Sequence, residues 1–161
     1  MINFAKPIYA WIYFLMVLLQ PKAPWKDTYE LTAIAIGDAS ESNPLFSGQN
    51  GIVKTAAVLI SLAWFESRFD PNALGDKGKS HGLFQQQGMG DLSDPKVATV
   101  VALQQIKISF RICSNKRIEE KLGWYAAGGP DCERGLVQSK HRMLKAFWLV
   151  QKYPFDESKF Q

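Results

Sequence analysis

One long apolar stretch constrains the fold of this chain more than any other part of the sequence. From Thr55 to Phe65 no residue carries a charge, and residues 56–65 read AAVLISLAWF. A run that is apolar on every side belongs in the interior of a protein, either as a buried strand or as a buried helix. Its length and its alanines favour the helix. We therefore expect a central buried helix that is surrounded by other helices.

Further helices are expected on both sides of this run, because apolar residues recur there at spacings of three and four. Asp94 followed by Pro95 is a favourable helix start, since Asp caps the first turn and Pro fits the first helical position. The expected helices cover residues 27–39, 96–113, 116–126 and 133–152. No strand pattern alternates with these helices, which argues against a parallel sheet. The predicted fold class is all-α, with at most a tiny hairpin in the glycine-rich residues 71–90.

The composition suits one domain with a substantial core. The chain has 161 residues, and 47% of them are hydrophobic, which argues against disorder. The net charge of +4 is mild and scattered, so it suits an anionic polymer and is too weak to indicate nucleic-acid binding. We expect the domain to cover residues 25–152, with a separate segment over residues 1–24 and a frayed tail over residues 153–161.

The N-terminal segment is a second apolar run with three competing interpretations. Residues from Ile8 to Leu19 are uninterrupted by charge, but a dozen residues fall short of the roughly 20 that cross a bilayer as a helix. In the first interpretation, the run is an uncleaved export or anchor segment that contacts a membrane. In the second, it is a helix docked on its own domain or on a partner. In the third, it is a signal peptide that is removed. The last interpretation lacks an Ala-x-Ala-like cleavage site.

Glu66 is the candidate catalytic residue, because it emerges at the end of the charge-free run. Burial raises the pKa of a carboxyl group, which keeps a neutral acid available near neutral pH. Protonating a glycosidic oxygen requires such an acid. The structural alternative is a glutamate that pairs with Arg68 or caps a loop, and periodicity alone does not decide between the two.

Two motifs in register strengthen the catalytic interpretation. Residues 66–73 read ESRFDPNA and residues 78–85 read GKSHGLFQ. Over roughly residues 24–150 the chain resembles the soluble lytic transglycosylase family of the lysozyme-like superfamily, whose motifs run Glu-Ser-x-Phe-x-Pro-x-Ala and Gly-Leu-Met/Phe-Gln. The third family motif, Tyr-Asn-Ala-Gly, corresponds here to YAAG at residues 125–128, so Ala126 replaces the usual asparagine.

The resemblance implies a lysozyme-like helical fold, with the central helix ending at the catalytic glutamate, and cleavage of the MurNAc–GlcNAc bond of peptidoglycan. Glu66 would be the single general acid and base of a lytic transglycosylase, whose product carries a 1,6-anhydro-MurNAc end. Tyr125 would form a wall of the cleft. The expected substrate-binding residues are Ser67, Ser80, Gly82, Gln85 and Tyr125.

Four of these residues carry more specific expectations. Ser67 either caps the backbone at the helix end or touches the substrate's N-acetyl group. Ser80 shapes the glycine loop, and Gly82 is needed because backbone approaches closely there. Gln85 bridges Glu66 or the substrate through its amide. The lysines and arginines of the last helix are interpreted as a solvated face.

Two alternative functions stay open. Ordinary glycosidases use two carboxylates, and Asp70, Asp76 and Asp91 are the candidates for a second one in a hydrolytic muramidase on the same fold. The other alternative is a non-catalytic wall-binding or structural protein of a phage particle or secretion system, which the replacement by Ala126 favours.

Cys113 and Cys132 are the two cysteines of the chain. They are either reduced and buried, or paired in an oxidising compartment. A bridge would close a loop of about 19 residues and stabilise the fold by roughly 3 kcal/mol in the chain-entropy model. Without Cys-x-x-Cys, and with two distant histidines, the sequence predicts no metal and no cofactor. We expect a monomer in the periplasm, in the cell envelope or outside the cell, with peptidoglycan as its partner and no nucleic acid.

Overall fold

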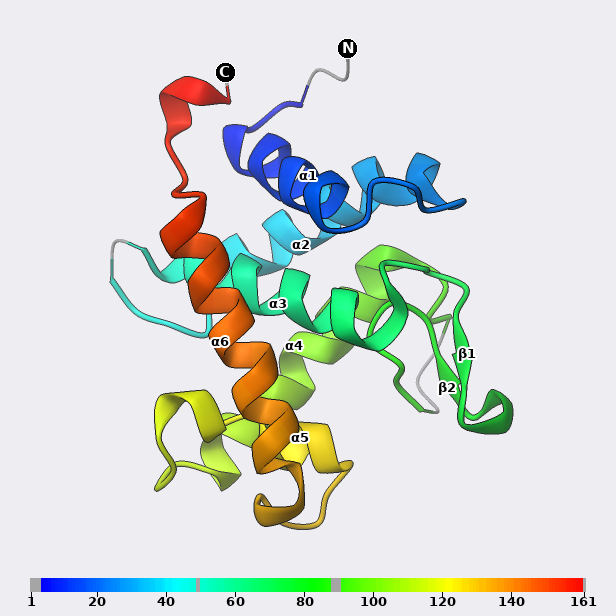
Figure 1. The fold of residues 1–161 in the computed structure, drawn as a ribbon, viewed down its shortest axis with the longest axis vertical. Coiled ribbons are helices and arrows are strands. Elements are labelled where there is room, and N and C mark those ends of the chain that lie inside the picture. Colours follow the sequence, from blue (N-terminus) through cyan, green and yellow to red (C-terminus); the bar gives the residue numbers. More distant parts are fainter. Residues whose placement is uncertain (1–3, 49, 88–90, 161) are drawn as a thin grey trace.

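The computed structural model describes residues 4–48, 50–87 and 91–160, which form six α-helices and one tiny antiparallel sheet (Figure 1). The helices are α1 (Pro7–Leu19), α2 (Tyr29–Ser42), α3 (Gly51–Ser67), α4 (Pro95–Ile112), α5 (Gly123–Ala127) and α6 (Leu136–Lys152). The strands are β1 (Leu74–Gly75) and β2 (Ser80–His81). Short 3-10 turns are η1 (Lys26–Thr28), η2 (Asp76–Gly78), η3 (Ile118–Glu120), η4 (Glu133–Gly135) and η5 (Glu157–Lys159). The protein is thus mainly helical with a small hairpin, as the sequence predicts.

Of the residues that the structure does not describe, 1–3, 88–90 and 161 belong to three predicted segments: the N-terminal segment, the glycine-rich loop and the tail. Those parts of the three predictions lie outside the described residues.

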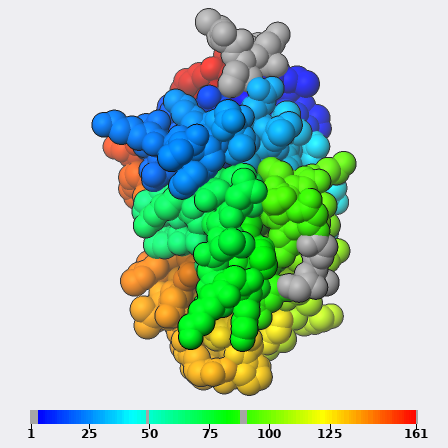
Figure 2. Space-filling view, turned by 90° about the vertical axis from the view of Figure 1, so that its right-hand side faces the viewer, coloured from blue at the N-terminus to red at the C-terminus, as the bar shows by residue number. Residues whose placement is uncertain are grey.

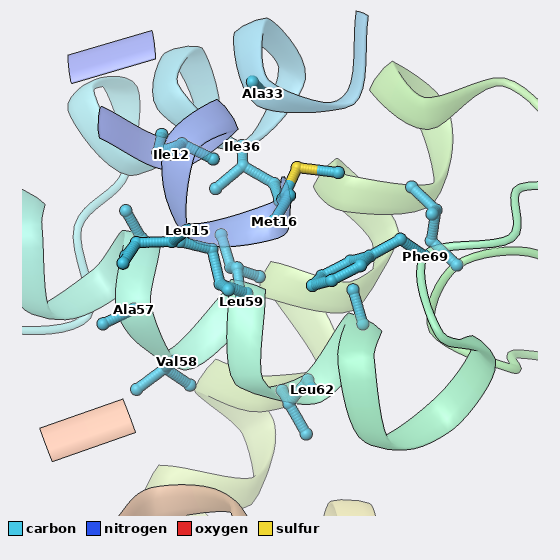
Figure 3. Close-up of a cluster of buried hydrophobic side chains, with 14 of the residues drawn as sticks. Ile12, Leu15, Met16, Ala33, Ile36, Ala57, Val58, Leu59, Leu62 and Phe69 are labelled. Atoms are coloured by element: carbon cyan, nitrogen blue, oxygen red, sulfur yellow. The ribbon is translucent and has the colours of Figure 1, made fainter. Parts of the chain in front are cut away.

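Helix α3 is the central helix of the fold. Every residue from Thr55 to Ala63 is buried, which explains why this run tolerates no charge. Figure 3 shows Ile12 of α1 and Ile36 of α2 in the same cluster as Leu59 and Leu62 of α3. Each fully buried aliphatic side chain of this kind contributes about 1.5–3 kcal/mol relative to an exposed one. The predicted buried helix is therefore present, and it ends beside Glu66.

The N-terminal apolar run forms α1 and packs inside the domain. Trp11, Ile12, Leu15 and Met16 are fully buried against α2 and α3. The indole Nε1 of Trp11 donates a hydrogen bond to the carbonyl oxygen of Tyr153 at 2.9 Å. Among the described residues, no helix combines the length and the apolar character that a membrane span needs. Helix α1 thus shares one hydrophobic core with the helices that follow it.

The C-terminal tail is packed, which differs from the frayed end expected from the sequence. The Phe155 ring lies 6.0 Å from the ring of Trp11, and the Phe160 ring lies 6.0 Å from that of Phe14. The prediction is wrong because the tail carries aromatic side chains that cover the apolar surface of α1.

The helix predicted over residues 116–126 is divided into η3 and α5. Two serines from neighbouring helices bond to the backbone between these pieces. The Ser109 hydroxyl of α4 donates to the carbonyl oxygen of Lys121 at 2.8 Å, and the backbone N–H of Leu122 donates to the Ser139 Oγ of α6 at 3.0 Å. These tertiary hydrogen bonds replace those that a continuous helix would make, so the single predicted helix is wrong.

Cys113 and Cys132 form a disulfide, which settles the choice that the sequence left open. The bridge joins the residue that follows α4 to the residue that precedes η4. Helix α5 lies within the loop that the bridge closes. The disulfide therefore restrains the short helix that carries Tyr125.

Candidate active site

A cleft of about 560 Å³ lies between residues 74–87, called the hairpin region below, and helices α5 and α6. Figure 2 shows the green hairpin region in front, with the yellow and orange surfaces of residues from α5 and α6 below and beside it. Residues from five separate parts of the chain, including Val101 and Gln105 of α4, line the cleft. They include Glu66, Asp76, Ser80, Gln85, Tyr125, Ala126 and Arg142. The fold thus brings four of the predicted site residues together in one cleft: Glu66, Ser80, Gln85 and Tyr125.

The end of α3 sets the position of Glu66, which is the penultimate residue of that helix. The chain leaves the helix through Arg68 and Phe69, whose φ angles of 56° and 66° are left-handed. A left-handed residue after a helix stops the α-helical hydrogen-bond ladder. The ring of Phe69 is fully buried, which holds this unusual backbone in place. Glu66 therefore leaves the buried helix at the cleft.

An ion pair occupies one oxygen of the Glu66 carboxylate. Arg142 donates from Nε and from Nη2 to Oε1 of Glu66, at 3.0 and 2.6 Å. The Glu66 side chain is 19% exposed and the Arg142 side chain is 14% exposed, so water screens the charges of this pair weakly. The guanidinium carbon of Arg142 lies 5.7 Å from the centroid of the Phe65 ring. The hydroxyl of Ser61 donates to the Arg142 carbonyl oxygen at 2.7 Å, which fastens this turn of α6 to α3.

Arg142 is the site residue that sequence reasoning missed, and it corrects two expectations. The arginine that pairs with Glu66 is not Arg68, whose guanidinium stacks 4.0 Å from the Trp64 ring. The basic residues of the last helix also do not all face solvent. A signal was present, because Arg142 lies three residues after Ser139 and four before Ala146, both of which are buried. That spacing places an arginine beside the apolar stripe of the helix.

Tyr125 supplies a second polar wall from α5. Its hydroxyl donates to the carbonyl oxygen of Phe84 at 3.2 Å, and its backbone N–H donates to Ser109 Oγ at 3.1 Å. Burial raises the pKa of the Tyr125 hydroxyl, the negative charge of Glu66 raises it further, and Arg142 opposes the shift. The phenol is therefore a neutral hydrogen-bond donor throughout the physiological range. The expectation that Tyr125 lines the cleft agrees with this position.

Ser67 and Gly82 shape the site from outside the cleft lining. The Ser67 hydroxyl lies 2.9 Å from the carbonyl oxygen of Leu83 and 3.1 Å from that of Ala63, so it links the helix end to the second motif. This is the backbone role that the sequence left as one of two alternatives. Gly82 has φ of 75°, and a Cβ there would lie 2.1 Å from the carbonyl oxygen of Leu92. The close backbone approach predicted at Gly82 is therefore present.

Gln85 holds the hairpin region together. Its Nε2 donates to the carbonyl oxygens of Ala73 and Gly82, both at 3.1 Å. Among the described residues no hydrogen bond joins Gln85 to Glu66, so that alternative of the expected bridge is absent, and a bridge to the substrate stays a prediction. The absence has a physical reason, because the amide hydrogens satisfy loop carbonyls that would otherwise lack a partner.

One of the three candidate second carboxylates, Asp76, lines the cleft together with Glu66. Asp76 Oδ2 accepts a hydrogen bond from the Ser80 hydroxyl at 2.5 Å, which is the loop-shaping role expected of that serine. Asp70 and Asp91 each accept from a backbone amide two residues further along the chain, and neither lines the cleft. The site therefore contains two carboxylates of different character, one ion-paired and one on the exposed hairpin.

Within residues 4–48, 50–87 and 91–160, no three acidic, histidine or cysteine side chains gather closely enough to ligate a metal. The cleft offers two carboxylates, a guanidinium, a phenol and amide groups, which suit proton transfer and hydrogen bonding to a polar ligand. Comparisons of this chain with protein-family models, with curated proteins and with solved structures gave no match. The functional argument therefore depends on the sequence motifs and on the geometry of the cleft.

Proposed function

We propose that this protein is a peptidoglycan lytic transglycosylase with a lysozyme-like fold, and that Glu66 is its general acid and base. The main support is the position of Glu66, at the end of the buried central helix and in a cleft of about 560 Å³. The same cleft holds Ser80, Gln85 and Tyr125 from the other two motifs. The hydroxyl, amide and charged side chains of this cleft can hydrogen-bond to the sugars of a glycan chain.

In the proposed reaction Glu66 first donates a proton to the glycosidic oxygen, and the bond from C1 of MurNAc to that oxygen breaks. The substrate's own N-acetyl group stabilises the cationic intermediate. Glu66, now a carboxylate, takes the proton of the C6 hydroxyl while O6 bonds to C1, which closes the 1,6-anhydro ring. No water is consumed, and Glu66 ends in its starting form.

The ion pair suggests how the two oxygens of Glu66 divide these tasks. Both hydrogen bonds from Arg142 go to Oε1, and no described residue donates to Oε2. Oε2 is therefore the oxygen that exchanges the proton with the substrate. The Tyr125 hydroxyl, half-buried beside this pair, donates its proton to the Phe84 carbonyl oxygen, and its oxygen can accept a hydrogen bond from a sugar hydroxyl.

Two observations favour the alternatives. Asp76 in the cleft supplies a second carboxylate, which a hydrolytic muramidase would use. The ion pair of Glu66 and the apolar side chain of Ala126 would both suit a protein that binds the wall without cleaving it.

The products of digested sacculi separate these functions. Wild-type protein should release fragments with 1,6-anhydro-MurNAc ends, which mass spectrometry distinguishes from reducing MurNAc ends by the mass of one water. E66Q should release no fragments above background, whereas E30Q, an equal change at an exposed position of α2, should behave as wild type. Reducing ends would indicate the muramidase, and equal digestion by E66Q would refute catalysis through Glu66.

The disulfide supports a location outside the cytoplasm for this function. Peptidoglycan lies in such a compartment, either in the periplasm or at the cell surface.

A further inference from the structure

We propose that Arg142 also binds the carboxylate of the substrate, so that the protein selects muramyl glycan over neutral glycan of GlcNAc alone. This inference rests on the proposed function, because it assigns the feature of the substrate that the cleft recognises. MurNAc differs from GlcNAc by a lactyl ether that ends in a carboxylate. A residue that contacts this group therefore distinguishes two glycans with the same sugar backbone.

The hydrogen bonds of Arg142 leave room for a second anion. A guanidinium has five N–H donors, and Arg142 directs one from Nε and one from Nη2 to Oε1 of Glu66. Among the described residues, no acceptor bonds to its Nη1. The side chain lines the cleft, so the remaining edge of the planar guanidinium is available to a ligand. Arginine suits this task because its fixed fork matches a carboxylate.

Packing holds the guanidinium in place before a ligand arrives. The backbone of Arg142 is tied to α3 by the Ser61 hydroxyl, and its side chain lies over the Phe65 ring. Little rotational freedom is lost when a ligand binds to such a side chain, which strengthens the interaction.

The described lining of the cleft holds one cation, Arg142, and two acids, Glu66 and Asp76, while the Tyr125 hydroxyl is neutral. Because the acids outnumber the cation, Arg142 is the position in this lining at which an anion can bind. Lys145, from the same helix, lies 5.2 Å over the Trp64 ring and outside the lining. The Arg142 charge is thus shared between Glu66 and any bound anion.

The test is a binding comparison in the E66Q background, which prevents turnover. The two probes are a peptide-free tetrasaccharide of alternating GlcNAc and MurNAc, and the GlcNAc tetramer, titrated by calorimetry. We expect E66Q to bind the muramyl tetrasaccharide more tightly. E66Q/R142Q should lose about tenfold in affinity for it and less than about threefold for the GlcNAc tetramer. E66Q/R142K should recover part of the loss, because lysine keeps the charge without the fork.

E66Q/K145Q is the matched control, since it removes a cation from α6 outside the cleft lining and should leave both affinities unchanged. Thermal melts establish that each variant is folded. Equal losses for the two probes in E66Q/R142Q would overturn the inference, and so would an equal selective loss in E66Q/K145Q. If E66Q binds both tetrasaccharides with equal affinity, the inference about Arg142 is refuted and the proposed function is not. If E66Q binds neither probe, the result counts against the proposed function as well.

Discussion

The disulfide between Cys113 and Cys132 should stabilise the fold by about 3 kcal/mol. The bridge spans a sequence separation of 19 residues, and the chain-entropy relation gives about 3 kcal/mol at 25 °C for a loop of that length. In a domain of this size each kcal/mol shifts Tm by about 2–4 °C. Replacing both cysteines by alanine should therefore lower Tm by about 6–12 °C. Alanine is preferred to serine because both positions are buried and a hydroxyl there would need a partner.

Circular dichroism at increasing temperature measures this shift, and wild-type protein in reducing agent is the matched control. The reduced protein and the double-alanine variant should have similar Tm values. The loop contains α5, so loss of the bridge should also reduce the protection of the Tyr125 amide against hydrogen exchange. A change in Tm below about 2 °C would refute the reasoning, because the closed loop would then impose little restraint on the unfolded chain.

Three further predictions concern the cleft and its supports. D76N should keep most of the lytic activity and the anhydro product; a loss of about 100-fold or more would instead indicate a two-carboxylate hydrolase. G82A should lower the free energy of unfolding by at least about 2 kcal/mol in a urea titration, because its Cβ meets the Leu92 carbonyl oxygen at a positive φ; an unchanged midpoint would contradict that contact. Tyr125 has a raised pKa in the folded protein, so the folded state retains a proton above pH 10 that the unfolded state releases. Wild-type stability should therefore fall above pH 10, and Y125F should show a shallower fall in melts over that range; parallel curves would argue against the buried phenol.

Much of the fold follows from local sequence signals. The charge-free run predicts α3 because a helix that is buried on every side has no place for a charge. The start of α4 follows from Asp94 and Pro95, and the Asp94 side chain accepts from the Lys96 backbone N–H at 2.8 Å as an N-cap should. Glycines and Pro71 likewise predict the non-helical region that contains the small hairpin.

The contacts that complete the site depend on how distant helices meet. Glu66 and Arg142 are 76 residues apart, and no local pattern reports that α6 brings this arginine to the end of α3. The division of the helix predicted over residues 116–126 has the same origin, since Ser109 and Ser139 reach it from α4 and α6. Periodicity in the sequence predicts which face of a single helix is buried. Predicting these hydrogen bonds also requires knowing how several helices are placed relative to one another.

The product ends of digested peptidoglycan test the central claim most directly. Wild-type protein and E30Q should release glycan fragments with 1,6-anhydro-MurNAc ends, and folded E66Q should release none. That result would assign the proton transfers to Glu66 and exclude water as the nucleophile. Fragments released by E66Q at the wild-type rate, or reducing MurNAc ends from the wild type, would contradict the proposed reaction.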